Sequence, residues 1–373
     1  MILFIDFFKA ERVWVRDRMR LVNINYVEEG EILARPIVSP FGNVLLQAGI
    51  TLIQNYINRL SNMGVDVIFI EDDQFEDVEV YTGVSAQTRK AAYSTLQNLT
   101  NFVKEGQLST LGADKIQALI EQMIDDLMAS HDILSNIVEI RDYDNYTYRH
   151  SINTTVIALL LGIAMGWDNS RLLEFGMGVI MHDIGKMKIP QEILNKKGPL
   201  TESEFIEIKK HAEYGFELLR KNQDFSILSA HIAFQHQEKW DGTGYPRGLK
   251  GTEIHEFGRV AAVADVYEAL TSKRVYREAM QPHEAFEYVV SQRGTHFEPR
   301  VLDIFSKSIA VYPSGSGVKL SNGQRGNVIR QNPAFPTRPY VRVTHEGDIR
   351  LLRPIDYNLA EHPSLMIVGV VNK

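Results

Sequence analysis

The sequence predicts a mainly α-helical protein, in which a helical bundle follows a small α/β or β-rich domain and precedes a small β-rich module. Apolar residues recur every three to four positions through most of residues 85–311, which is typical of packed helices. Both flanks carry short apolar runs separated by glycine, proline and asparagine, as strands joined by turns do. We therefore expect domains at residues 1–84, 85–311 and 312–373, with residues 1–18 as an upstream extension of the first.

The first domain contains four segments with the pattern of regular structure. "ILARPIV" and "NVLLQAG" predict two strands, separated by the turn signal "SPFG". "TLIQNYINRLSNMG" has helical spacing, and Gly64 suits the C-terminal end of that helix. "VDVIFI" predicts a buried strand, and the acidic run from Glu71 to Glu79 predicts a solvated linker after it.

The bundle begins with two long segments of helical pattern, "IQALIEQMIDDLMASHDILSNIVEI" and "HSINTTVIALLLGIAMGW". The apolar run Val156–Trp167 is about twelve residues long, and the N-terminal apolar patch is shorter, whereas a membrane-spanning helix needs about twenty. We therefore expect a buried core helix and no membrane insertion. Further helices are expected at residues 170–183, 202–220, 226–238, 256–272, 282–291 and 298–308.

In the last domain, short apolar runs predict strands in "GVKLS", "RGNVIRQ", "PYVRVT" and "LMIVGVV". An Asn-Gly pair and several prolines separate them. Basic residues outnumber acidic ones in this segment. We interpret them as a solvated edge, with contact to a protein partner as the alternative.

Charge and cysteine content limit the partners of the chain. The formal net charge of −7 over 373 residues argues against duplex nucleic acid, which needs a broad basic face. A small anionic ligand is compatible with it, since a local site can be positive inside an acidic protein. The chain has no cysteine, so disulfides and thiolate metal sites are excluded and a reducing cytoplasm is the simplest location.

An adjacent pair, His182-Asp183, ends an apolar helix in "GVIMHDIGKMKIP", and Lys186 follows at a spacing that lets it face the same cavity. Further polar residues on otherwise apolar helices are His150, His211, His236 and Asp265. Taken singly, such residues are more often satisfied core groups than ligands. Together with His182 and Asp183 they favour a shared polar centre, because burying an uncompensated carboxylate costs several kcal/mol. A pair of divalent cations would satisfy all of them.

Four motifs, "HDIGK", "HAEYG", "HQEKWDGTGYP" and "ADVYEALTSKRVYRE", resemble the HD-GYP domain, a branch of the HD superfamily of metal-dependent phosphohydrolases. The resemblance covers roughly residues 130–310, in the right order, and the two flanks resemble segments seen in the same family. It implies an HD-type helical bundle. It also implies hydrolysis of cyclic di-GMP, a bacterial second messenger, to pGpG and in some members to GMP.

Carried over residue by residue, the resemblance implies two divalent metal ions, and the histidine and carboxylate ligation favours iron or manganese. One ion would be held by His150, His182, Asp183 and Asp265. Asp183 would bridge to the second ion, which His211 and His236 also hold.

The same resemblance implies the substrate contacts, and two-metal chemistry gives a hypothesis for the mechanism. A hydroxide that bridges the two metal ions beside Asp183 would attack the phosphorus atom. Lys186 would stabilise the charge that develops on the phosphoryl oxygens. Lys186 matches the lysine that contacts the substrate phosphate. The remaining contacts match basic positions near the other phosphate and the name-giving loop beside the cleft: Arg274, Arg277, Gly244, Tyr245 and Pro246.

Two departures from the family pattern leave alternatives open. The family stretch begins His-His-Glu, whereas this chain has His236-Gln237-Glu238, and Gln237 is at best a weak metal ligand. A catalytically weak cyclic di-GMP sensor or scaffold is therefore one alternative, and another HD-superfamily nucleotide phosphohydrolase is a second. Tyr146 stands where three-metal members have Glu, which favours two metals. A homodimer, and protein partners for the terminal domains, stay open.

Overall fold

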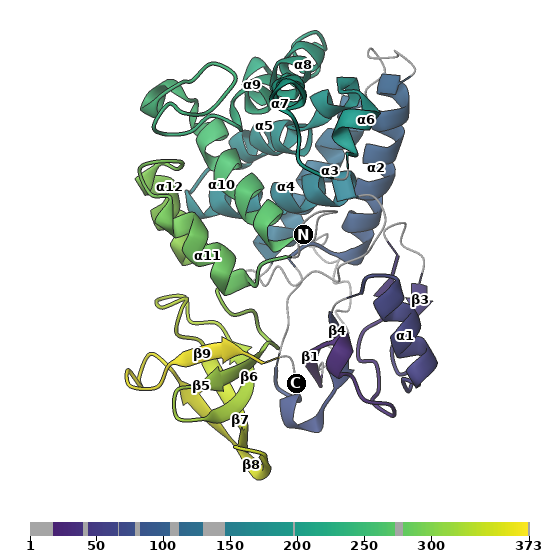
Figure 1. Cartoon of the computed structure of the whole chain (residues 1–373), viewed down its shortest axis with the longest axis vertical. Coiled ribbons are helices and arrows are strands. Elements are labelled where there is room, and N and C mark those ends of the chain that lie inside the picture. Colours follow the sequence, from purple (N-terminus) through teal and green to yellow (C-terminus); the bar gives the residue numbers. More distant parts are fainter. Residues whose placement is uncertain are drawn as a thin grey trace, which may run out of the picture.

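The computed structural model places a helical bundle above two smaller β-containing parts (Figure 1). It describes residues 18–39, 44–65, 67–78, 83–104, 112–129, 146–196, 198–272 and 279–371. The predicted fold class is confirmed: the protein is mainly α-helical, with a small α/β part before the bundle and a β module after it. The domain boundaries after residues 84 and 311 stay predictions.

The described residues of the N-terminal part form two short antiparallel strand pairs, one α-helix and two short 3-10 helices, η1 (Ile24–Tyr26) and η2 (Asp73–Phe75). Strand β1 (Met19–Asn23) pairs with β4 (Val67–Glu71), and β2 (Ile37–Val38) pairs with β3 (Val44–Leu46). Helix α1 (Gln54–Asn62) buries its apolar face on the same core. Strand β1 is not among the predicted segments, and the expected upstream extension lies outside the described residues apart from its last position.

The bundle is built around two helices that are buried on most sides, α4 (Tyr146–Ala164) and α10 (Glu256–Thr271), which pack against each other. Such helices are core helices, and α4 contains the apolar run that predicts one. None of the described helices has the length and apolar character to cross a membrane. Around them lie α2 (Ala86–Lys104), α3 (Ala113–Ala129), α5 (Asn169–Ile180), η4 (Ile184–Lys188), α6 (Gln191–Leu194), α7 (Glu202–Lys209), α8 (His211–Leu219), α9 (Ile227–Gln235), α11 (Pro282–Ser291) and α12 (Pro299–Ser308).

The C-terminal module is one antiparallel sheet with the strand order β8-β7-β6-β5-β9. Strand β8 is absent from the predicted set. It is an edge strand with mostly exposed side chains and it contains Pro354, which a central strand would not tolerate. The strands are β5 (Gly317–Leu320), β6 (Gln324–Arg330), β7 (Tyr340–Glu346), β8 (Ile349–Asn358) and β9 (Ile367–Val370).

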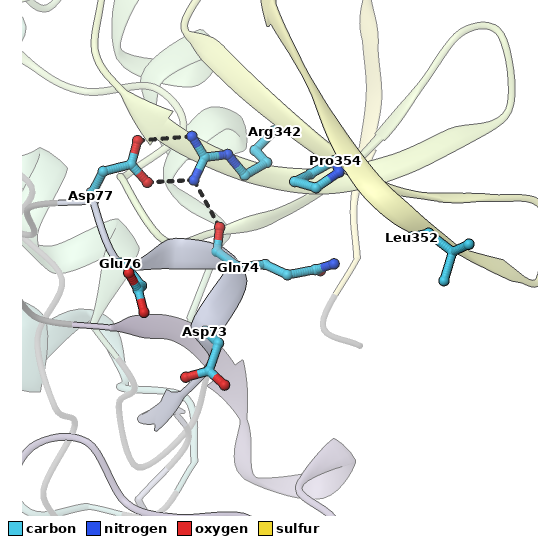
Figure 2. A pocket seen from close by; sticks show the side chains of 7 residues that line it. All are labelled: Asp73, Gln74, Glu76, Asp77, Arg342, Leu352 and Pro354. Atoms are coloured by element: carbon cyan, nitrogen blue, oxygen red, sulfur yellow. Dashed lines mark hydrogen bonds and ion pairs between the residues drawn. The ribbon is translucent and has the colours of Figure 1, made fainter.

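The acidic run after β4 is bound to the C-terminal sheet by arginine. Figure 2 shows the Arg342 guanidinium against the carboxylate of Asp77 and the backbone carbonyl of Gln74, with Nη2–Oδ2 and Nη1–O distances of 2.9 and 2.7 Å. Asp356 of β8 accepts from Nε of the same guanidinium at 2.8 Å. Asp73, Glu76 and Asp77 are exposed, as the prediction of a solvated segment requires, but Arg342 also ties this segment to the sheet. The prediction of a solvated basic edge is wrong at Arg342, which is 8% exposed.

An open groove of ≈ 440 Å³ lies beside this contact, between the N-terminal part and the sheet (Figure 2). The guanidinium lowers the pKa of Asp77, mainly through the hydrogen bonds it donates. The contact thus joins the first and last parts of the chain below the bundle. The groove is lined by Asp73, Gln74, Glu76, Asp77, Arg342, Leu352 and Pro354.

Candidate metal centre

The His182-Asp183 pair lies where α5 ends and the chain turns sharply into η4. Because the helix stops at this point, the two adjacent side chains both face the centre of the bundle. Gly185 allows this turn to pack on α8: a Cβ there would lie 1.9 Å from the carbonyl oxygen of His211 and 2.5 Å from the nitrogen of Gly215. Only glycine fits, and the close contact brings His211 to the Asp183 carboxylate.

Four buried histidines share one hydrogen-bonding arrangement. In each ring Nδ1 faces an oxygen acceptor and donates to it, which leaves Nε2 directed at the centre. This arrangement is the one that histidine adopts as a metal ligand. The acceptors are the carbonyls of Val179 for His182 (2.7 Å), Ile208 for His211 (2.7 Å) and Ala233 for His236 (3.0 Å), and the carboxylate of Glu268 for His150.

Asp183 lies between two pairs of these rings and turns one oxygen to each pair. Its Oδ1 is 3.7 Å from Nε2 of both His211 and His236. Its Oδ2 is 3.6 Å from Nε2 of His150 and 3.4 Å from Nε2 of His182. The carboxylate is therefore placed to serve two neighbouring cations, one with each oxygen.

Two further carboxylates reach the centre from α10. Oδ1 of Asp265 lies 3.1 Å from Nε2 of His150. Glu268, one turn later, accepts the Nδ1 proton of His150 and is itself bound by Ser272. Glu268 is not among the candidates predicted from the sequence, although a second acid three residues after Asp265 on the same helix shares its face and is a usable signal.

The pKa values of these groups follow from burial and from their neighbours. Burial lowers the pKa of His211 to about 4, so its ring is neutral at pH 7, as a metal ligand must be. Burial opposes the charged form of Asp183, yet Lys186 and His182 outweigh it and hold its pKa well below the usual range. Lys186 makes an ion pair with Asp183. Burial also opposes the charge on His150, but mainly Glu268 raises its pKa to about 9, so a metal ion at this ring would have to displace the Nε2 proton.

The donor set fits divalent cations. Among the residues that the structure describes, Nε2 of His182 and Oδ1 of Asp183 are buried without a hydrogen-bond partner. A buried carboxylate oxygen left in this state is costly, and a cation would satisfy it. Nitrogen and oxygen donors of this kind suit iron, manganese or zinc. Three groups of donors lie close enough to share an ion: His150/His182/Asp183, His182/His236/Asp265 and Asp183/His211/His236.

The stretch that follows α9 is held in place by hydrogen bonds between one of its side chains and its own backbone N–H groups. Both oxygens of Glu238 accept backbone N–H groups, from Arg247 at 2.8 Å and from Leu249 at 3.0 Å. Glu238 thus fastens the loop. Gly244 is also a packing requirement: a Cβ there would lie 2.3 Å from the nitrogen of Lys239. The clash is with the chain itself.

Gln237 and Tyr245 meet at the rim of the centre. The Gln237 amide donates to Oδ2 of Asp265 at 3.0 Å and accepts from the Tyr245 hydroxyl at 3.0 Å. The Tyr245 ring lies 6.2 Å from the His211 ring, and a cis peptide bond joins it to Pro246. Its loop therefore lies beside the candidate ligands. Arg274, Arg277 and the side chain of Tyr146 lie outside the described residues, so their roles stay predictions.

Two segments of the chain match known protein families. Residues 132–301 match the family model of the HD domain. This segment of the chain is similar to the HD domain. Residues 317–373 match a second model, the KOW domain associated with HD domain, which covers the β module. The HD-domain match spans the helices that carry the six candidate metal ligands.

Curated relatives share this segment. A cyclic di-GMP phosphodiesterase of Pseudomonas aeruginosa is 34% identical over 225 residues, 60% of this chain and 54% of that protein. A cyclic di-GMP phosphodiesterase of Thermotoga maritima is 39% identical over 177 residues, 47% of this chain and 48% of that protein. The 3'3'-cGAMP-specific phosphodiesterase 2 of Vibrio cholerae is 42% identical over 125 residues, 33% of this chain and 24% of that protein. The chain spans about half the length of the first two.

Proposed function

We propose that this chain is a metal-dependent phosphodiesterase that hydrolyses cyclic di-GMP to pGpG. One observation carries the proposal. The buried carboxylate of Asp183 has an oxygen without a hydrogen-bond partner among the described residues, and it lies among four imidazoles whose Nε2 atoms point inward. The names of the relatives in Pseudomonas aeruginosa and Thermotoga maritima support cyclic di-GMP as the substrate.

The geometry supports two ion positions that share Asp183. Iron or manganese is the metal that we propose for both. When bound, a pair of such ions lowers the pKa of a coordinated water towards about 7 and neutralises charge on the phosphate. The first position would be formed by His150, His182, Asp183 and Asp265, and the second by Asp183, His211 and His236.

The residues of the chain have distinct tasks in this proposal. The Nδ1 hydrogen bonds hold each imidazole in one tautomer and one orientation, so the site needs little rearrangement on metal binding. Lys186 is part-exposed and uses one donor on Asp183, which leaves two ammonium protons for a phosphate oxygen. Arg274 and Arg277 are proposed to bind the distal phosphate.

A second cyclic dinucleotide is a competing substrate. The 3'3'-cGAMP-specific phosphodiesterase of Vibrio cholerae is 42% identical to this chain over the segment that they share. The two substrates differ in one base and not at the scissile phosphate, so the metal centre by itself favours neither. We place the reaction in a bacterial cytoplasm, which suits a chain without cysteine.

The experiment is a substrate panel with anaerobically purified protein loaded with Fe²⁺ or Mn²⁺. Cyclic di-GMP, 3'3'-cGAMP and a linear dinucleotide are incubated in turn, and the products are separated by chromatography. The proposal predicts two ions per chain, pGpG as the product, and loss of turnover after chelation. Equal turnover after exhaustive chelation would refute it. Tight binding of cyclic di-GMP without turnover in the loaded protein would instead favour a sensor.

A further inference from the structure

The side chain of Gln237 has only one orientation that satisfies both of its neighbours. Its amide nitrogen lies 3.0 Å from Oδ2 of Asp265, and its amide oxygen lies 3.0 Å from the hydroxyl of Tyr245. An ionised carboxylate accepts hydrogen bonds only, so the NH₂ group must face Asp265. The carbonyl oxygen, the atom with which an amide coordinates a cation, then faces Tyr245.

This orientation has a consequence for Asp265. The amide occupies Oδ2, which leaves Oδ1 on the side of His150, 3.1 Å from Nε2, and 4.0 Å from Nε2 of His182. Asp265 therefore presents one oxygen to the ion position formed with these two histidines. A carboxylate that accepts a hydrogen bond on its other oxygen is held in that direction.

Tyr245 keeps the amide oxygen turned away from the ions. Besides the side-chain bond, its backbone nitrogen donates to the backbone carbonyl of Gln237 at 3.1 Å, so the two residues are joined twice. The loop is also fastened to the neighbouring Glu238. Turning the Gln237 oxygen to a cation would break the bonds to Asp265 and Tyr245 together.

We infer that Gln237 is a positioning residue and not a metal ligand. It holds Asp265 towards the first ion position and leaves the second position with three protein ligands, Asp183, His211 and His236. The inference rests on the proposed metal centre and extends it. A site with three protein ligands retains open coordination positions, as catalytic metal sites do. Gln237 also connects the Tyr245 loop to a ligand of the first ion.

The test uses a background that retains only the first ion position. His211→Ala removes a ligand of the second position, and Mn²⁺ affinity is then measured by titration calorimetry in His211→Ala and in His211→Ala/Gln237→Leu. If Gln237 acts by positioning Asp265, then Gln237→Leu should lower the Mn²⁺ affinity of the remaining position about 10- to 100-fold. If Gln237 were a ligand of the second ion, the substitution would change nothing in this background, and that result would overturn the inference.

Two controls separate positioning from a general structural effect. In His211→Ala/Asp265→Asn, Gln237→Leu should change Mn²⁺ affinity less than about threefold, because the residue it acts through is gone. Gln235→Leu removes the amide that accepts a hydrogen bond from the backbone N–H of His255. It should lower the melting temperature without changing the Mn²⁺ affinity. An equal loss of Mn²⁺ affinity in Gln235→Leu would mean that any damage to this helix end suffices, and would overturn the inference.

A further readout concerns the second ion in the otherwise unchanged chain. Gln237→His offers an imidazole to the second ion and removes the amide from Asp265. It should therefore tighten Mn²⁺ binding at the second position about tenfold and remove about one exchangeable water there, as proton relaxation reports, while binding at the first position weakens as in Gln237→Leu. No change in water count or affinity would contradict an open second site. These readouts need no turnover. A chain that binds the ions as described but cleaves no cyclic dinucleotide would refute the proposed function and leave the role of Gln237 intact.

Discussion

Gly185→Ala is the substitution that best tests how the fold assembles the metal centre. The added Cβ would lie 1.9 Å from the carbonyl oxygen of His211, and real Cβ contacts essentially never fall under 3.0 Å. The turn that carries Asp183 and the start of α8 must therefore separate by at least about 1.1 Å. Metal–ligand distances tolerate only about 0.2 Å, so the shift is several times larger than the site allows.

We therefore predict that Gly185→Ala retains the helical fold but loses the second ion. Overpacking of this kind costs about 1–3 kcal/mol, which a chain of this size should survive. Elemental analysis should fall from two ions per chain to one. Turnover of cyclic di-GMP should fall at least about 100-fold, since a displacement of about 1 Å at a reacting centre has that effect.

Gly369→Ala is the matched control for this prediction. A Cβ at Gly369 would meet nothing within 4 Å, and the position lies in the C-terminal sheet, away from the centre. Far-UV circular dichroism should be unchanged in both variants, while only Gly185→Ala loses metal. If Gly185→Ala kept two ions at the wild-type affinity, the close packing of the turn on α8 would not be what positions Asp183.

The other predictions concern single side chains. Asp183→Ala should abolish turnover and metal binding with little change in circular dichroism, because the bundle buries a large apolar core without the ions; wild-type turnover in this variant would contradict the ligand assignment. Glu268→Leu should lower the Mn²⁺ affinity of the position next to His150 about 10- to 100-fold in a titration, because Nδ1 of His150 loses its acceptor. Asp77→Asn should lower the free energy of unfolding by no more than about 1 kcal/mol at pH 7, because Asp77 is 67% exposed. The pKa of Asp77 is lowered in the folded chain, so this contribution should be present above the ordinary pKa of 3.8 and should vanish as the pH falls through the folded value. A difference between Asp77→Asn and wild type that grew at low pH would be the wrong sign.

The sequence predicts the bundle and the candidate ligands well because the two depend on the same pattern. Long apolar helices leave few polar positions, so His182, Asp183 and Asp265 stand out against their surroundings. The helix end at the His182-Asp183 pair also explains how adjacent residues reach one centre. Which oxygen faces which ring depends on the packing of α5, α8, α9 and α10, and no local spacing contains that information.

What the sequence does not predict has physical reasons. Glu268 and Gln237 act through hydrogen bonds to other residues, on α4 and α10, so their tasks depend on contacts between segments far apart in the chain. Strand β8 lies at a sheet edge, where exposed side chains replace the alternating pattern that predicts strands. Asp77 looks like a solvated acid until Arg342, more than 250 residues later, is brought beside it.

Elemental analysis of three proteins purified anaerobically in Mn²⁺ tests the central claim most directly. If six side chains hold two ions that share one carboxylate, wild type should contain two ions per chain. His211→Ala should then contain one and Asp183→Ala none, with circular dichroism unchanged throughout. Two ions retained in Asp183→Ala would contradict the account, because the cations would then be bound elsewhere.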